Sequence, residues 1–257
     1  MSAVMSVKIN TQLLHEAAKA GNAEDVRRLI PLSDPKFNNS EALQAAAARG
    51  HTQCVELLIP MSTPDGWNRA LNAAAQSGHV HCIELLIPMG DPKAHESAPL
   101  RNAAERGYVE CVKILIPVSN PKVDGSSALR GAAQYGHAEC VKLLIPVSNP
   151  KTKNSAALQW AVMNEHAQCV ALLAPVSDCT INDSAPLMLA TSRKNRECME
   201  FLFDYSHPFQ ALKSLKKNCP GDEDLYQFFE NFMAERQRHV LQNALGERGK
   251  KTSTRKM

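Results

Sequence analysis

The chain has 257 residues, of which 44% are hydrophobic and 21% are charged, and its formal net charge is +3. This hydrophobic content excludes a disordered chain and is typical of a packed fold. No apolar run reaches the roughly 18 residues that a membrane-spanning helix needs, so we expect no membrane insertion. The opening MSAVMSVKIN also lacks the apolar core of about 7–15 residues found in secretory signals, so we do not expect export by the Sec route.

Residues 1–9 are predicted to be an N-terminal extension, and residues 10–205 form a region with a regular repeat. Six cysteines are separated by 28, 29, 29, 29 and 29 residues, at Cys54, Cys82, Cys111, Cys140, Cys169 and Cys198. Prolines recur with the same period, at Pro31, Pro60, Pro88, Pro117, Pro146 and Pro175. A fixed period of this length predicts a stack of similar units that pack on their neighbours.

Residues 126–151, SSALRGAAQYGHAECVKLLIPVSNPK, illustrate one unit. Ser127, the serine before Ala-Leu, is predicted to cap a short helix, whose buried face contains Leu129, Ala132 and Ala133. Gly136 ends this helix, because glycine tolerates a left-handed backbone. A second, longer helix follows and ends at Pro146, and the rest forms an extended return loop.

This unit resembles the ankyrin repeat, whose pattern runs T-P-L-H-x-A-A-x-x-G-H-x-E-V-V-K-L-L-L. The match is nearly complete at residues 98–116, APLRNAAERGYVECVKILI, and the L-H-x-A-A core recurs at residues 14–18. The resemblance covers about residues 10–204 and implies an all-α solenoid of about seven helix pairs. Ankyrin repeats have about 33 residues, whereas these have 28 or 29. The missing residues fall where the family carries a β-hairpin finger, so we expect short loops there without hairpins.

The ends of the repeat region depart from its pattern. Asp25 takes the cysteine position in the first unit, and Glu165 and Lys194 replace the helix-ending glycine in the last two. Residues 206–245 are predicted to form a helical cap, with a long amphipathic helix that starts after Asp222, ends near residue 245 and covers the open end of the stack. Residues 246–257 are predicted to be a disordered basic tail, with a net charge of +4.

The cysteines raise the questions of disulfides and metal binding. Equivalent positions in stacked helices lie roughly 8–10 Å apart, too far for a disulfide, whose Cβ atoms must lie within about 4.5 Å. This favours a reducing compartment, and we expect the cytoplasm, with nuclear or host-cell delivery left open. The His-x-x-Cys pairs resemble metal half-sites, but zinc needs four ligands and one unit supplies two. We therefore expect no bound metal, with the cysteines buried and the histidines ordering the turn. The pairs are His51/Cys54, His79/Cys82, His137/Cys140 and His166/Cys169.

No catalytic motif stands out in the sequence. The stretch that begins His15-Glu16 lacks the second histidine of the H-E-x-x-H zinc motif, and no G-x-S-x-G elbow or phosphate-binding glycine loop is present. We therefore expect neither enzymatic activity nor a cofactor.

Candidate binding residues are found where the units differ from each other. Core positions hold constant, whereas the two residues before the glycine and the loop tips vary, and in ankyrin repeats these variable positions line the concave surface. Aromatic residues make up only 5% of the chain, so Trp67, Tyr135 and Trp160 are candidate anchors. The alternative to an anchor role for Trp160 is that its side chain fills a gap opposite Gly131 in the preceding unit. The candidates are Arg49, Trp67, Gln76, Glu105, Arg106, Gln134, Tyr135, Met163, Asn164 and Arg193.

The resemblance implies a non-enzymatic scaffold or adaptor that binds a protein partner along the concave ankyrin groove. A host-directed effector is one form of such an adaptor that stays open. The alternative is binding of nucleic acid or of an anionic surface through the basic tail, which would weaken steeply with salt. Because no aromatic residue is interleaved with the basic residues of the tail, we expect a protein partner rather than nucleic acid.

Overall fold

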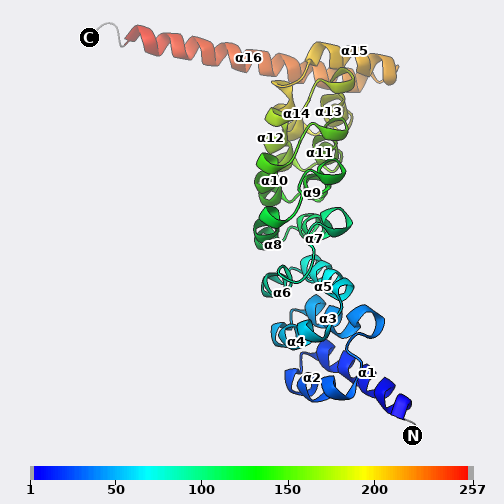
Figure 1. Cartoon of the computed structure of the whole chain (residues 1–257). Helices are drawn as coiled ribbons and strands as arrows, with labels where there is room; N and C mark the ends of the chain where they lie inside the picture. The colour runs from blue at the N-terminus through cyan, green and yellow to red at the C-terminus, as the bar shows by residue number, and fades with distance from the viewer. Residues whose placement is uncertain (1–2, 254–257) are drawn as a thin grey trace.

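The computed structural model describes residues 3–253, and every regular element within that range is helical. Fourteen helices form seven consecutive pairs that stack into an elongated solenoid, and two further helices close its C-terminal end (Figure 1). The predicted all-α solenoid of about seven helix pairs is thereby confirmed, and the described residues contain no hairpin. The paired helices are α1 (Ala3–Ala20), α2 (Ala23–Leu29), α3 (Phe37–Arg49), α4 (Thr52–Leu58), α5 (Pro64–Ser77), α6 (Val80–Leu86), α7 (Ala94–Glu105), α8 (Val109–Leu115), α9 (Val123–Gln134), α10 (Ala138–Leu144), α11 (Thr152–Met163), α12 (Ala167–Leu173), α13 (Ile181–Ser192) and α14 (Arg196–Phe203).

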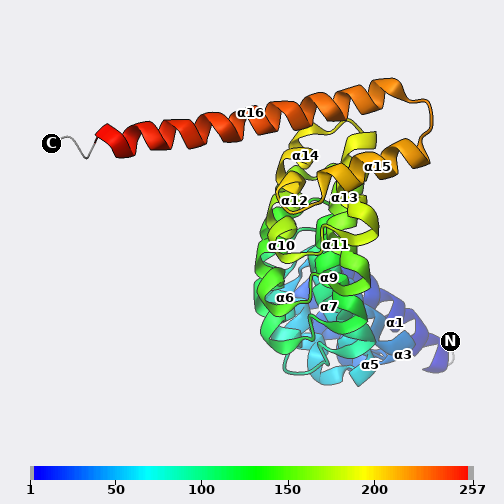
Figure 2. The same cartoon turned by 90° about the horizontal axis from the view of Figure 1, so that it is seen from above.

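The helices lie in two layers. The odd-numbered helices α1 to α13 stack side by side in an inner layer, and the even-numbered helices α2 to α14 form an outer layer (Figure 2). Each unit contacts chiefly the units before and after it, as expected for a solenoid. Specificity in such a stack must come from what each unit presents on its surface.

Contrary to the prediction, the second helix of a unit is not clearly longer than the first. In the fifth unit α9 spans 12 residues, but Asp124, Gly125 and Ser126 near its start have a left-handed backbone, and α10 spans 7 residues. The second helix ends because Pro146 has no N–H to donate, and the chain tightens into a 3₁₀ turn at Ile145–Val147. Similar turns follow α2, α4, α8 and α12.

The loop that replaces the ankyrin finger is a left-handed turn. At the start of α9, Asp124, Gly125 and Ser126 have φ angles of 45°, 59° and 60°. Comparable left-handed residues open α3, α7 and α11. Helix α5 differs, because Pro64 holds φ near −65° and Thr63 caps the helix by accepting a hydrogen bond from Gly66 N at 3.1 Å. This right-handed start belongs to the one unit that is a residue shorter than the others.

The last residue of each left-handed turn bonds to the return loop that follows the second helix of the same pair. Ser126 is buried, and its Oγ accepts a hydrogen bond from Asn149 N at 2.9 Å. The predicted cap at Ser127 is wrong, because Ser127 lies inside α9. The same bond spans 23 residues in every unit, with distances of 2.6–3.0 Å. The acceptor and donor residues are Thr11/Asp34, Ser40/Thr63, Asn68/Asp91, Ser97/Asn120, Ser126/Asn149, Ser155/Asp178 and Ser184/His207.

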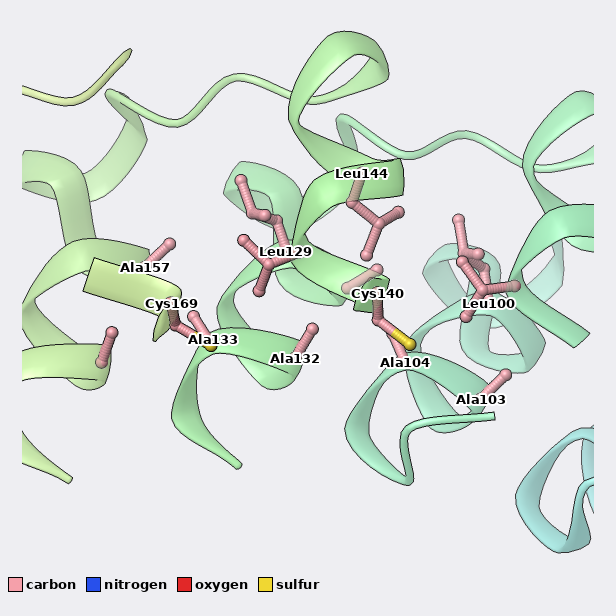
Figure 3. Packing of buried hydrophobic residues seen from close by; sticks show 14 of the residues in the cluster. Leu100, Ala103, Ala104, Leu129, Ala132, Ala133, Cys140, Leu144, Ala157 and Cys169 are labelled. Carbon is pink, nitrogen blue, oxygen red and sulfur yellow. The ribbon is translucent and has the colours of Figure 1, made fainter. Parts of the chain in front are cut away.

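The core runs the length of the stack between the two layers. Leu129 and the alanines of α9 pack against Cys140 and Leu144 of α10, and equivalent residues repeat in the flanking units (Figure 3). Cys140 and Leu144 are both fully buried. The alanines keep the side chains between stacked helices small, which allows close approach of neighbouring units.

Helices α15 (Pro208–Asn218) and α16 (Glu223–Ser253) cover the C-terminal end of the stack (Figure 1). Phe229 and Phe232 of α16 are buried, and Arg236 pairs with Asp204 at 2.6 Å. The predicted capping helix is therefore present.

Two predicted boundaries need correction. Helix α16 continues to Ser253 rather than ending near residue 245. It projects beyond the edge of the stack (Figure 1, Figure 2). The segment 246–253 is thus helical rather than disordered, and residues 254–257 lie outside the described range. At the other end, α1 starts at Ala3 and includes most of the predicted N-terminal extension.

Candidate functional site

The turn that ends each inner helix is covered by a side chain of the next unit, in most units a histidine. We call this contact the histidine clamp. Gly136 follows α9 with φ of 78°, and a Cβ at this position would lie 2.7 Å from Nδ1 of His166 in the next unit. The glycine is therefore needed both for its left-handed backbone and for the space that the histidine ring occupies. The ring in turn donates a hydrogen bond from Nε2 to the carbonyl oxygen of Gln134 at 3.1 Å.

The clamp recurs through the stack. Nε2 of each histidine donates to a carbonyl oxygen of the preceding unit at 3.0–3.2 Å, in the pairs His51/Lys19, His79/Ala48, His137/Glu105 and His166/Gln134. The ring of Tyr108 covers Gly78 in the same way. Where the glycine is lost, at Glu165, the following unit has Asn195 in place of histidine. Asn195 instead caps α14 by accepting a hydrogen bond from Cys198 N.

These contacts explain the His-x-x-Cys pattern without a metal. Each imidazole is engaged with the preceding unit, and each ladder cysteine is buried in the core. Within residues 3–253, no three His, Cys, Asp or Glu side chains come together in a way that would hold an ion. Burial raises the pKa of the Cys111, Cys140 and Cys169 thiols to about 11, so these thiols stay protonated at neutral pH.

Thiol labelling checks the burial of this ladder. In native protein, Ellman's reagent should react slowly with Cys111 and Cys140, because the thiolate is the reactive form and both side chains are at most 1% exposed. After denaturation, labelling should be fast and complete. Fast labelling of both residues in the native protein would contradict the packing described above. Cys219, which is half-buried, provides an internal standard for a more accessible thiol.

Nine of the ten candidate residues lie together at the C-terminal ends of the inner helices. They come from α3 to α13 and from the residue that follows each helix, so they form a row along one edge of the inner layer. Most of the nine are exposed, and Glu105 and Gln134 are half-buried. The row consists of Arg49, Gln76, Glu105, Arg106, Gln134, Tyr135, Met163, Asn164 and Arg193.

Trp67 does not belong to this row. It lies in the first turns of α5, where its side chain is half-buried against the core, and its Nε1 donates to the carbonyl oxygen of Ile59 at 2.9 Å. The indole therefore ties the start of α5 to the turn after α4. Trp67 thus contributes to packing, in a unit that has no left-handed turn at the start of its first helix.

The structure does not support the alternative role predicted for Trp160, which was to fill the gap opposite Gly131. The atoms nearest to a Cβ placed on Gly131 all belong to Glu105 of the preceding unit, so Glu105 fills the gap that was assigned to Trp160. The Trp160 side chain is 38% exposed, close to Met163 one turn later at 39%. Sequence reasoning underrated this residue, although its position in the unit varies as widely as those of the candidates, from Ala45 to Leu189.

Tyr135, Trp160 and Met163 form what we call the aromatic patch. Trp160 and Met163 lie three residues apart on α11 and so share one face of that helix. Tyr135 follows α9, which packs beside α11, and it is 55% exposed. The bond from His166 to the carbonyl oxygen of Gln134 holds the end of α9 next to the turn that follows Met163. Large apolar side chains from two neighbouring units are therefore displayed on one surface.

Charged residues border this patch. Arg193 pairs with Glu165 across two units at 3.5 Å, and Arg101 lies 3.9 Å from Glu105. An exposed apolar centre with a polar rim is the usual arrangement of a protein-binding surface.

A second charged cluster joins the loop tips of the fifth and sixth units. Hydrogen bonds from Lys153 and Arg130 lower the pKa of Asp124 to about 2. This carboxylate therefore stays ionised throughout the physiological range, and it links neighbouring loops by pairing with both Arg130 and Lys153.

None of the helices within residues 3–253 is both long enough and apolar enough to cross a bilayer. A family model for ankyrin repeats matches the chain in three overlapping segments, at residues 14–96, 89–155 and 131–212. No curated protein matches the sequence.

Two solved structures are similar to this chain. An ankyrin repeat domain from Acinetobacter baumannii AYE is 25% identical, with a TM-score of 0.54, and the match covers 64% of this chain and 98% of that one. The human ASB11 ankyrin repeat domain is 21% identical, with a TM-score of 0.48, over 85% of this chain and 96% of that one. The family match extends over most of the seven helix pairs, and the bacterial structure shares their stacking. The chain therefore belongs to the ankyrin repeat family.

Proposed function

We propose that this protein is a non-enzymatic scaffold that binds a partner protein along the row of inner-helix ends, with the aromatic patch as the anchor. Ankyrin repeats are in general modules for protein–protein interaction, which supports the class of function. The observation that carries the proposal is the exposure of Tyr135, Trp160 and Met163 on adjacent units. Tryptophan and tyrosine supply a disproportionate share of the binding energy in protein interfaces.

The buried thiols support a reducing compartment such as the cytoplasm as the site of action. Seven of the eight cysteines are buried and free, and they sit one to a unit or in the following loop. Oxidised thiols at these positions would have to move out of the core to pair.

A capture experiment tests the proposed binding surface. The intact chain is used as bait in a lysate, the strongest specific ligand is identified, and its dissociation constant is measured with purified components. The double variant Tyr135→Ala/Trp160→Ala should bind that ligand at least about 30-fold more weakly, which corresponds to about 2 kcal/mol. Its melting temperature should change little, because both side chains are exposed.

Two further variants make the result interpretable. Tyr205→Ala/Phe209→Ala removes two exposed aromatic rings from the C-terminal end of the stack and should leave binding unchanged. Removal of residues 246–257 tests the alternative, in which the basic segment binds nucleic acid or an anionic surface. If truncation abolishes binding while the patch variant binds normally, the proposed surface is incorrect and the basic segment is the functional element.

A further inference from the structure

The N-terminal end of the stack carries an apolar surface that has no counterpart in the other units. Met5, Ile9 and Leu13 are spaced by four residues on α1 and so form one stripe along that helix. All three are exposed, and so is Leu32, whose carbonyl oxygen accepts a hydrogen bond from Asn10 of α1 at 3.0 Å. We call Met5, Ile9, Leu13 and Leu32 the terminal stripe.

Comparison between units indicates that the terminal stripe is suited to packing against another protein surface. Leu13 occupies a position that is buried in each of the six following units, where it is alanine or proline: Ala42, Ala70, Pro99, Ala128, Ala157 and Pro186. Ala42 of α3 lines a hollow together with residues of α1 in the unit before it, so this position faces the preceding unit. In the first unit the residue is a larger leucine, and it is 50% exposed. A terminal unit that faces only water normally carries polar residues there.

The first turns of α1 are also apolar on the side away from the terminal stripe. Val4 and Val7 line a hollow of about 740 Å³ between α1 and the start of α3, with Phe37 on its rim. A helix that is apolar around most of its circumference is normally buried. At the opposite end of the stack, α15 and α16 already supply such a cover, and it contains several aromatic residues.

The charges on α1 indicate which partner packs against the terminal stripe. Lys8 lies four residues before Gln12, and Glu16 lies four residues after it. The only other Lys, Arg, Asp or Glu on α1 is Lys19, whose Nζ lies 3.9 Å from a carboxylate oxygen of Glu16. If two copies of α1 pack antiparallel about a two-fold axis at Gln12, Lys8 of each copy comes opposite Glu16 of the other. Leu13, one residue from the axis, then packs against its own copy. The surface is thus complementary to itself in charge as well as in polarity, as an isologous contact requires.

We propose that the terminal stripe is the contact surface of a homodimer, in which α1 helices of two copies pack antiparallel about Gln12. The inner-helix ends of both copies stay accessible, because the aromatic patch lies on α9 and α11, several units away. The proposal is therefore independent of the binding function proposed above, and it would make the scaffold bivalent.

Sedimentation velocity on the full-length protein over a range of concentrations tests the dimer. The wild-type chain should approach twice its monomer mass of 28.2 kDa. Leu13→Glu should weaken dimerisation by about 30-fold or more, because it places two carboxylates beside the two-fold axis. If that variant has a lower melting temperature, Ile9→Glu, one turn away, provides the same test. Phe209→Glu, at a side chain 70% exposed at the other end of the stack, is the matched control and should dimerise normally.

A charge exchange tests the antiparallel arrangement. Lys8→Glu alone and Glu16→Lys alone should each weaken the dimer, because each places like charges opposite one another. The double variant should recover the wild-type dissociation constant. The proposal is overturned if the wild-type chain is a monomer at every concentration, if Leu13→Glu and Ile9→Glu dimerise as well as wild type, or if the double exchange is no better than the single changes.

Discussion

Replacement of Leu144 by alanine is expected to lower the free energy of unfolding by about 2–5 kcal/mol. Leu144 is the last residue of α10, has no exposed surface and lies in the core of the central units (Figure 3). The substitution removes most of a buried side chain and leaves a cavity that the flanking helices fill only in part. Each unit depends on its neighbours, so the loss should appear in the cooperative unfolding of the stack.

Urea denaturation followed by circular dichroism measures this change. Leu143→Ala is the matched control, because Leu143 precedes Leu144 on the same helix but is only half-buried. Its effect should be clearly smaller. A loss below about 1 kcal/mol for Leu144→Ala would contradict the position given to Leu144 in the core.

Replacement of Gly136 by alanine is expected to cost about 2–4 kcal/mol, although it adds a single methyl group. Part of the cost arises because φ at this position is 78°, where an L-residue other than glycine is strained. The rest arises because the added Cβ overlaps the ring of His166. The bond from His166 to the carbonyl oxygen of Gln134 should weaken as the ring is displaced.

Lys194→Gly provides a control that should change the free energy of unfolding in the opposite direction. Lys194 occupies the equivalent position in the seventh unit with φ of 54°, so glycine there should relieve strain and raise stability by up to about 1 kcal/mol. Thermal unfolding of both variants measures the difference. If Gly136→Ala proved as stable as wild type, the histidine clamp would not contribute to the stability of the stack.

The sequence was sufficient to predict the stack itself, because its signals recur in each unit. The cysteine and proline periods predicted the helix pairs, and Gly136 predicted the left-handed end of α9, which the φ angle of 78° confirms. The burial of Cys140 and Leu144 also follows from the apolar spacing of the second helix.

The connections between units could not be predicted in the same way. In the left-handed turn at residues 124–126, Asp124 and Gly125 tolerate this conformation but Ser126 does not favour it, so local propensity alone does not specify three such residues in a row. The turn is held by contacts that span 23 residues, such as that from Asn149 N to Ser126 Oγ. A serine before a helix is normally interpreted as a cap, and only the folded chain shows that Ser126 bonds instead to the return loop after α10.

The structure places most candidate residues along the inner-helix ends, but it gives two of the aromatic residues roles that the sequence did not predict. Trp67 and Trp160 are both tryptophans at variable positions, and composition cannot separate them. In the folded chain Trp67 donates to the carbonyl oxygen of Ile59, in the turn after α4 of the preceding pair. Trp160 is exposed, and Glu105 fills the space beside Gly131. That distinction depends on which residue of the preceding unit reaches the gap.

Hydrogen–deuterium exchange of the protein with and without its captured ligand tests most directly whether binding takes place on the inner-helix ends. The account predicts that the ligand slows exchange around the C-terminal ends of α9 and α11, at peptides that contain Tyr135 and Met163, and leaves the outer helices α8 and α10 unchanged. Protection confined to the outer helices or to α16, with no change around the aromatic patch, would contradict it.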